Sequence, residues 1–244
     1  MKAITIWLIN KCNFNCYYCS ARQGIEPMDH EYPPDGRVTR VNNRQLLAWL
    51  DRYLDPGEWL LELTGGEPGL YPEIDTLIPE LTGRGYHGII QTNGSLQIPK
   101  SNNFVRTAAW HGECKPSFYD KIIIIKDPKS NWIDKAKWCK ENNISFRLIG
   151  LNETFRGKPP VVYPQSKGIN ITHYAFINAY GQLADCWKGP FYEDYCIRDM
   201  SLPPDFDLRF AGGNCTNCVN VRAIEIACED EHWNPFPADE THSE

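Results

Sequence analysis

Three cysteines near the start of the chain have the spacing of metal-cluster ligands. Cys12, Cys16 and Cys19 place three thiols within eight residues. Thiolates in such a loop can bind three irons of a cubane 4Fe-4S cluster, which leaves the fourth iron without a protein ligand. An open iron can chelate the amino and carboxylate groups of a small molecule, so the spacing favours catalysis over electron transfer alone. The alternative is a zinc site, which normally needs a fourth protein ligand.

These cysteines follow the first of several short apolar runs that predict β-strands. The runs alternate with amphipathic segments, of which residues 43–54 and 131–142 have helical periodicity. Repeated strand-then-helix units predict a parallel sheet. The expected strands cover residues 3–9, 59–63, 88–91, 121–125 and 144–149.

Chemically distinctive residues follow four of the five runs. Ligands of parallel α/β sheets bind at the carboxyl ends of the strands, so we expect these four strand ends to converge on one site. In chain order the four groups are Cys12, then Gly65-Gly66-Glu67, then Thr92-Asn93-Gly94, then Gly150 with Glu153.

The segment from Cys12 to Cys19 resembles the CxxxCxΦC signature of the radical S-adenosylmethionine (SAM) superfamily, with Tyr18 at the aromatic position. The resemblance implies that the three cysteines bind the 4Fe-4S cluster that cleaves SAM. It also implies that Tyr18 packs near the adenine.

Two further strand ends match the same family in the expected order. Gly65, Gly66 and Glu67 resemble its GGEP motif, which implies that a backbone edge and the glutamate hold the methionine amino group of SAM. Thr92 and Asn93 belong to a segment similar to its TNG element, which implies hydrogen bonds to the ribose hydroxyls. Either short motif alone is also explained by an ordinary turn.

The last strand end matches the family only in part. Residues 146–153 keep Gly150 and Glu153 of the GxIxGxxE adenine element, while Phe146 and Leu148 replace its first glycine and its isoleucine. Arg147 is expected to contact the SAM carboxylate, although an arginine here could also brace a surface. The resemblance extends over residues 1 to about 155.

The remaining residues have a different composition and predict a second unit. They contain an expected hairpin at 169–186, which turns at Tyr180 and Gly181. Four cysteines resemble the shortened "twitch" form of the SPASM extension, which implies a second 4Fe-4S cluster. They are Cys186, Cys196, Cys215 and Cys218. A zinc ribbon is the alternative, and Cys228 could replace Cys196 as the fourth ligand.

The predicted fold is therefore α/β. It consists of a partial (β/α) TIM-like barrel with parallel strands at residues 1–156 and a small, cysteine-rich, hairpin-containing domain with an acidic tail at 157–244.

The composition limits the classes of partner that the protein is expected to bind and the cellular compartment in which it is expected to work. The 244 residues carry a net charge of −6, which argues against a nucleic-acid partner, and no apolar run is long enough to cross a membrane. Ten cysteines without a secretory signal are typical of a reducing cytoplasm, where thiols bind metals.

The expected activity is that of a radical SAM oxidoreductase. The resemblance implies that SAM is reductively cleaved to a 5'-deoxyadenosyl radical, which abstracts a hydrogen from a small polar molecule in a net oxidation. Flavodoxin or ferredoxin would supply the electron. Modification of a ribosomal peptide and activation of a partner protein are open alternatives, and the non-enzyme alternative is an iron-sulfur electron carrier. The sequence names no catalytic acid or base, because the six histidines show no catalytic spacing.

Overall fold

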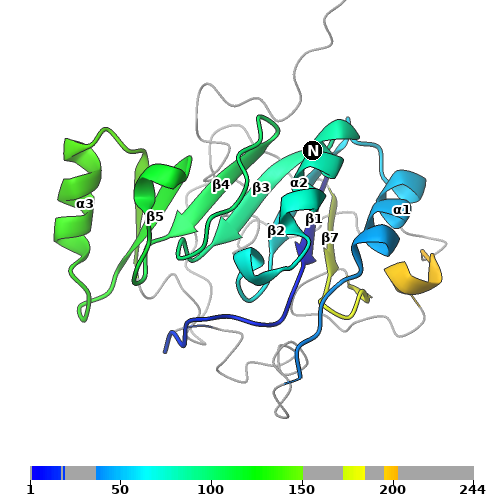
Figure 1. Ribbon diagram of the computed structural model, residues 1–244, viewed down its shortest axis with the longest axis horizontal. Coiled ribbons are helices and arrows are strands. Elements are labelled where there is room, and N and C mark those ends of the chain that lie inside the picture. The colour runs from blue at the N-terminus through cyan, green and yellow to red at the C-terminus, as the bar shows by residue number, and fades with distance from the viewer. Residues whose placement is uncertain (1, 18, 20–36, 151–172, 185–194, 203–244) are drawn as a thin grey trace, which may run out of the picture.

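The computed structural model describes residues 2–17, 19, 37–150, 173–184 and 195–202 of the chain. Its centre is an eight-stranded sheet in the order β6-β5-β4-β3-β2-β1-β7-β8. Figure 1 labels β5, β4, β3, β2, β1 and β7 of this sheet. Every neighbouring pair is parallel except β7 and β8, which are antiparallel. The strands are β1 (Lys2–Trp7), β2 (Trp59–Thr64), β3 (His87–Thr92), β4 (Phe104–Ala109), β5 (Lys121–Lys126), β6 (Phe146–Gly150), β7 (His173–Ile177) and β8 (Leu183–Ala184). The sheet is an unclosed partial barrel, so the predicted α/β class is confirmed.

In the described ranges, three α-helices cover the outer face of the sheet. They are α1 (Asn43–Tyr53), α2 (Ile74–Gly83) and α3 (Trp132–Glu141). Apolar residues of α1 and α2 share one core with alternate residues of β1, β2 and β3, whereas α3 packs with β5 and β6 in a second core. Alternate residues of each strand therefore face the helices, and the others line the inner face of the barrel.

The two predicted helices form within about one residue of their expected ends. Helix α1 begins after Asn42, whose side-chain oxygen accepts a hydrogen bond from Gln45 N at 3.0 Å and caps the helix. Cys139 of α3 is fully buried, as its apolar helix face predicts.

Strand β4 and helix α2 were not located from the sequence. Arg106 and Thr107 interrupt the apolar run of β4, and Pro79 interrupts the pattern of α2. Arg106 is nevertheless buried, because its Nε and Nη2 each donate a 3.0 Å hydrogen bond to the Asp120 carboxylate. An ion pair with a residue distant in sequence thus stabilises a buried arginine in a strand that the local apolar pattern does not predict.

The predicted hairpin forms and extends the barrel sheet. β7 and β8 pair around a turn in which Gly181 has a φ of +83°, a value that favours glycine. β7 also lies beside β1 in parallel register, so the hairpin continues the main sheet. The boundary at residues 156/157 stays a prediction, because 151–172 and 203–244 lie outside the described residues.

Three short 3-10 helices complete the described chain. They are η3 (Pro68–Leu70), η4 (Pro116–Phe118) and η6 (Ile197–Asp199). None of the helices in the described ranges has the length and apolar character needed to cross a bilayer.

Candidate active site

The chain after β1 stays paired with the sheet until the cysteine loop begins. Gly66 N donates to Ile9 O at 2.8 Å, and Glu67 N donates to Lys11 O at 2.9 Å. These bonds extend the β1 and β2 pairing beyond the strand ends. Cys12 follows the last of these contacts, so the loop leaves the sheet at its carboxyl edge.

The first cysteine is held at the end of β3. Asn93 Nδ2 donates to Asn13 Oδ1 at 2.8 Å and to Cys12 Sγ at 3.7 Å. Asn13 Nδ2 in turn donates to Ser95 Oγ at 2.9 Å. The family resemblance implies that Asn93 contacts the ribose, but here its amide also fixes the start of the cysteine loop.

Opposing influences act on the Cys12 thiol. Burial raises its pKa, and a hydrogen bond from Phe14 N at 3.4 Å lowers it. The negative charge of Glu67 raises the pKa further, and the Asn93 amide lowers it. The two donors favour the thiolate, which is the form that binds iron.

The rest of the loop reaches two further strand ends. A Cβ atom placed on Gly112, which follows β4, would lie 3.3 Å from the Phe14 ring, so this ring packs against the backbone there. Tyr17 Oη donates to Asp127 Oδ1, beyond β5, at 2.8 Å. The cysteine loop therefore contacts the ends of β3, β4 and β5 in turn.

Glu67 ties the end of β2 to the end of β3. Its side chain is fully buried, and Oε1 accepts hydrogen bonds from Thr92 Oγ1 at 2.6 Å and Gly69 N at 2.9 Å. Its Oε2 accepts from Asn93 N at 2.7 Å. Burial raises the pKa of Glu67 and these three donors oppose the rise. In this structure both carboxylate oxygens bind protein donors.

The three thiols form a donor set that is typical of an iron-sulfur cluster. Within the described ranges, which include Cys12, Cys16 and Cys19, no group of three or more His, Cys, Asp or Glu side chains is gathered to hold one ion. Zinc needs ligands that converge on one point. Thiolates of a cubane bind different irons and need not converge.

Apart from Cys196, the predicted site residues fall into three groups. The first meets around the cysteine loop: Cys12, Cys16, Cys19, Gly65, Gly66, Glu67, Thr92 and Asn93. Arg147 and Gly150 belong to β6, at the far edge of the sheet. The third group lies outside the described residues: Tyr18, Glu153, Cys186, Cys215, Cys218 and Cys228.

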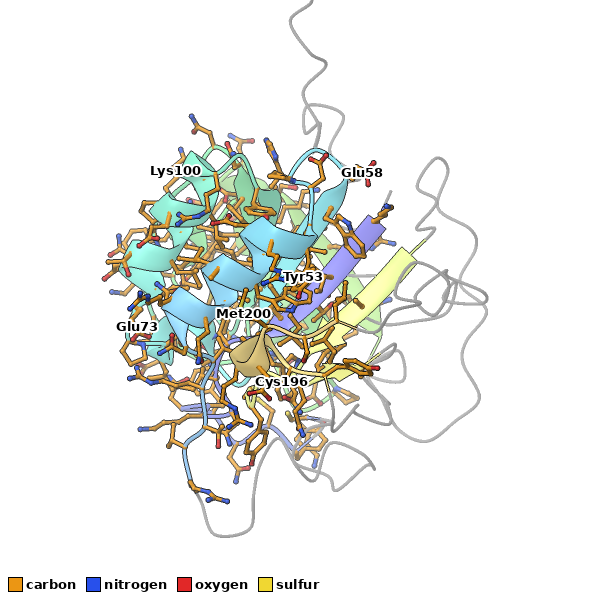
Figure 2. All side chains as sticks on the ribbon, turned by 90° about the vertical axis from the view of Figure 1, so that its right-hand side faces the viewer. Tyr53, Glu58, Glu73, Lys100, Cys196 and Met200 are labelled. Carbon is orange, nitrogen blue, oxygen red and sulfur yellow. The ribbon has the colours of Figure 1, made fainter. Side chains whose placement is uncertain are left out.

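Cys196 lies beside α1. Its thiol is buried and donates to Asp199 Oδ2 at 3.4 Å. The next turn is fixed to the helix, because Tyr53 Oη donates to Met200 O at 2.5 Å (Figure 2). The one predicted auxiliary ligand that the structure describes is thus anchored to the barrel.

A buried polar row on the inner face was missed by sequence analysis. Glu62 of β2 is fully buried and accepts hydrogen bonds from Thr5 of β1 and Gln91 of β3. Thr107 is the register partner of Gln91, and its buried hydroxyl has no hydrogen-bond partner in the described structure. Burial raises the pKa of Glu62 to about 8. The available signal was one acidic residue within the apolar run of β2.

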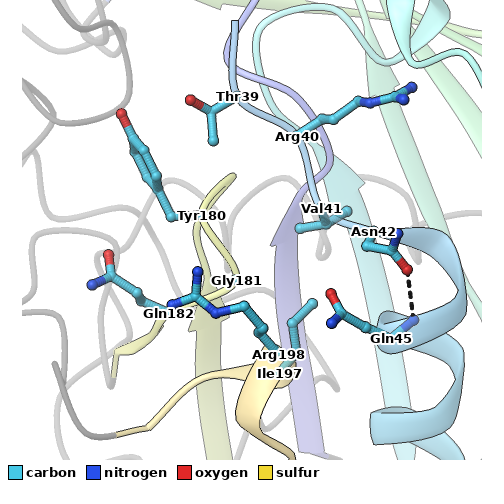
Figure 3. Close-up of a pocket in the computed structure, with 10 residues that line it drawn as sticks. All are labelled: Thr39, Arg40, Val41, Asn42, Gln45, Tyr180, Gly181, Gln182, Ile197 and Arg198. Atoms are coloured by element: carbon cyan, nitrogen blue, oxygen red, sulfur yellow. Dashed lines mark hydrogen bonds between the residues drawn. The ribbon is translucent and has the colours of Figure 1, made fainter.

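A pocket of about 320 Å³ lies apart from these residues. It is bounded by residues 39–42 and Gln45, the turn at 180–182, and residues 197–198 (Figure 3). None of the predicted cluster or SAM residues lines it. It therefore does not belong to the cysteine site.

Comparisons with known proteins agree with this geometry. The model of the radical SAM superfamily matches residues 7–155. The chain is 27% identical over 99 residues to AdoMet-dependent heme synthase of Nitratidesulfovibrio vulgaris, covering 41% of this chain and 24% of that protein. It is 25% identical over 124 residues to 7-carboxy-7-deazaguanine synthase of Haemophilus influenzae, covering 48% of this chain and 51% of that protein. The chain thus spans at most about half the length of these relatives.

Solved structures share the fold. SuiB of Streptococcus suis bound to precursor peptide SuiA has a TM-score of 0.56 at 15% identity, with 92% of this chain and 70% of that chain covered. SuiB bound to S-adenosylmethionine has a TM-score of 0.54 at 14% identity, with 92% and 71% covered. The family model covers more than half of the sequence, and the cysteine loop of this chain lies at the carboxyl edge of a partial barrel. The chain therefore belongs to the radical SAM superfamily.

Proposed function

We propose that this chain is an enzyme that binds a 4Fe-4S cluster through Cys12, Cys16 and Cys19 and reductively cleaves SAM. The observation that carries the proposal is the cysteine loop, which rests on three strand ends beside the buried Glu67. When bound, the cluster supplies the electron that splits SAM into methionine and a 5'-deoxyadenosyl radical, which abstracts a substrate hydrogen.

The residues around the loop would position SAM. The half-buried backbone of Gly65 and Gly66 would meet the methionine end, while Glu67 acts by holding the ends of β2 and β3 together. Thr92 and Asn93 would contact the ribose, as the family resemblance implies. Tyr18, Arg147, Gly150 and Glu153 complete the proposed SAM contacts from the remaining motifs.

For the substrate we propose a small polar molecule that is oxidised. Glu62, Gln91 and Thr107 support this class, because buried polar groups need hydrogen-bond partners and favour a polar ligand on the inner face. The substrate radical would pass its electron to a second 4Fe-4S cluster at Cys186, Cys196, Cys215 and Cys218. The buried, anchored Cys196 supports this site, and zinc is the alternative occupant.

Peptide modification is the second candidate. It is supported by the likeness to SuiB, which was solved with a precursor peptide and whose fold covers 92% of this chain. In either case flavodoxin or ferredoxin would donate the first electron. Deuterium transfer from labelled sugars or labelled peptides into 5'-deoxyadenosine would distinguish the two substrate classes.

The first test compares wild type with Cys16→Ala after anaerobic purification and cluster reconstitution. Iron and sulfide per chain are measured, together with 5'-deoxyadenosine formed from SAM under dithionite. Cys139→Ala is the matched control, because this buried thiol belongs to α3 and not to the cysteine loop. Wild type and Cys139→Ala should cleave SAM, and Cys16→Ala should not.

The iron content separates the remaining possibilities. About eight irons per chain would support two clusters, and about four would assign the second site to zinc or leave it metal-free. Equal cleavage by wild type and Cys16→Ala would overturn the proposal. A cluster-loaded wild type that neither binds nor cleaves SAM would make an electron carrier the better assignment.

A further inference from the structure

Tyr17 joins the middle of the cysteine loop to a strand end that is distant in sequence. It lies between Cys16 and Cys19, and its hydroxyl donates to Asp127 Oδ1, 110 residues further along the chain. Asp127 follows β5, and β5 is separated from β1 by three strands in the sheet. The contact therefore spans the mouth of the partial barrel.

Asp127 is itself a fixed acceptor. The residue is 7% exposed, and the same Oδ1 accepts a hydrogen bond from Lys129 N at 2.9 Å. Its backbone carbonyl accepts from Ser130 N at 2.9 Å. These local bonds close a turn directly after β5, so Tyr17 binds to a hydrogen-bonded turn at the end of this strand.

The Tyr17 ring has a second support. Lys129 Nζ lies 4.7 Å from the ring centroid, within the range of a cation–π contact. The hydroxyl and the ring face are thus held by two residues of the same turn. Because both contacts are side-chain contacts, they can be removed separately by substitution.

We propose that Tyr17, Asp127 and Lys129 form a latch that holds the Cys16–Cys19 half of the loop over the barrel mouth. Asn13 and Asn93 hold the Cys12 half at β3, so the latch is the matching support at the other end. Tyr17 is then a positioning residue for the cluster and for SAM. This inference rests on the proposed function, because the latch matters only if the loop carries the cluster.

The physical reason is that the open iron and the SAM-binding strand ends belong to different parts of the chain. SAM that chelates the iron must also reach the ends of β2 and β3. A small displacement of a reacting group lowers both affinity and rate. Loss of the latch should therefore loosen the cluster and weaken SAM binding while the protein stays folded.

The test uses the full-length, cluster-loaded protein and the variant Tyr17→Phe, which keeps the ring and loses the hydroxyl. Release of iron to bathophenanthroline disulfonate should be about tenfold faster, because the lost bond has a charged acceptor. The KM for SAM should rise by a larger factor than kcat falls. The matched control is Tyr86→Phe, which removes a 3.0 Å bond from a buried hydroxyl to Leu54 O in the helix-side core. Its iron release should equal that of wild type.

Two substitutions at Asp127 complete the design. Asp127→Ala removes the acceptor and should reproduce the Tyr17→Phe defect, and the double variant should be no worse than either single variant. Asp127→Asn keeps a carbonyl oxygen for both donors. Its iron release and its KM for SAM should therefore lie closer to those of wild type than the values of Asp127→Ala. A role in general stability would instead give additive losses and no rescue.

The outcomes separate the two proposals. A loaded wild type with the same iron release and the same KM as Tyr17→Phe overturns the latch and leaves the proposed function intact. A wild-type protein that holds no cluster after reconstitution overturns both.

Discussion

Glu62 and Glu67 are buried on neighbouring stretches of chain, but their hydrogen-bond partners differ. Glu62 contacts a threonine hydroxyl and a glutamine amide on the inner face of the barrel. Glu67 accepts from two backbone N–H groups, one on each carboxylate oxygen, and from Thr92. The same substitution, glutamate to glutamine, should therefore have different effects at the two positions.

Glu67→Gln should destabilise the protein. Glutamine has one acceptor oxygen, so either Gly69 N or Asn93 N would face an NH₂ group in place of a carboxylate oxygen. Leaving one buried donor unpaired costs about 1 to 3 kcal/mol. Urea denaturation of the anaerobic apo-protein measures the change. An unaltered free energy of unfolding would show that these bonds do not hold the strand ends.

Glu62→Gln should change the pH dependence of stability. The pKa of Glu62 is about 8 in the folded chain and 4.5 as an ordinary carboxyl, so folding takes up a proton between these values. Wild-type stability should therefore fall as the pH rises through this window and level off above it. Glutamine mimics the neutral acid and does not titrate.

The measurement is the melting temperature of both proteins across this pH range. Near pH 5 wild type and Glu62→Gln should melt at similar temperatures, and near pH 8 the variant should be the more stable. A constant difference between them over the window would contradict the raised pKa.

At the scale of elements, Gly65 lets the end of β2 approach the segment that leads to the cysteines. Its φ is +136°, and a Cβ atom there would lie 2.6 Å from Ile9 O. Gly65→Ala should cost about 1 to 3 kcal/mol from backbone strain alone. The displaced Ile9 would also pull on the start of the cysteine loop, so iron per chain after reconstitution should fall.

Gly83→Ala is the control for this prediction. Gly83 ends α2, a Cβ there meets no atom within 4 Å, and its φ is not positive. Its thermal stability should equal or slightly exceed that of wild type, because alanine restricts the unfolded chain. A Gly65→Ala protein with wild-type stability and iron content would show that the backbone here can shift freely.

Sequence patterning predicted the strands whose own residues are mostly apolar. The apolar runs of β1, β2, β3 and β5 mark strands that are buried on both faces, whereas residues 146–149 of the edge strand β6 are half-buried. β4 escaped prediction because its Arg106 is neutralised by Asp120, fourteen residues away. The local sequence around β4 does not show that Arg106 will pair with an aspartate so far along the chain.

At the scale of the whole molecule, the same distinction holds for the site. Cys12, Gly66 and Asn93 were predicted to meet because each follows a strand, and the structure brings them together. Tyr17 and Asp127 were not paired, since no spacing rule connects residues that meet only across the assembled sheet. The burial of both Glu67 oxygens likewise depends on the approach of two loops.

The cysteine loop also has a consequence for biogenesis. During synthesis the three thiols leave the ribosome before their supports at Asn93, Gly112 and Asp127, which follow about 75 to 110 residues later, several seconds at ordinary rates of translation. Until β5 has joined the sheet, the cysteine loop lacks these supports, and oxygen or a competing metal can reach the thiols. Delivery of iron and sulfide after the barrel has assembled would meet a loop already held in place, which favours insertion of the cluster into a folded chain.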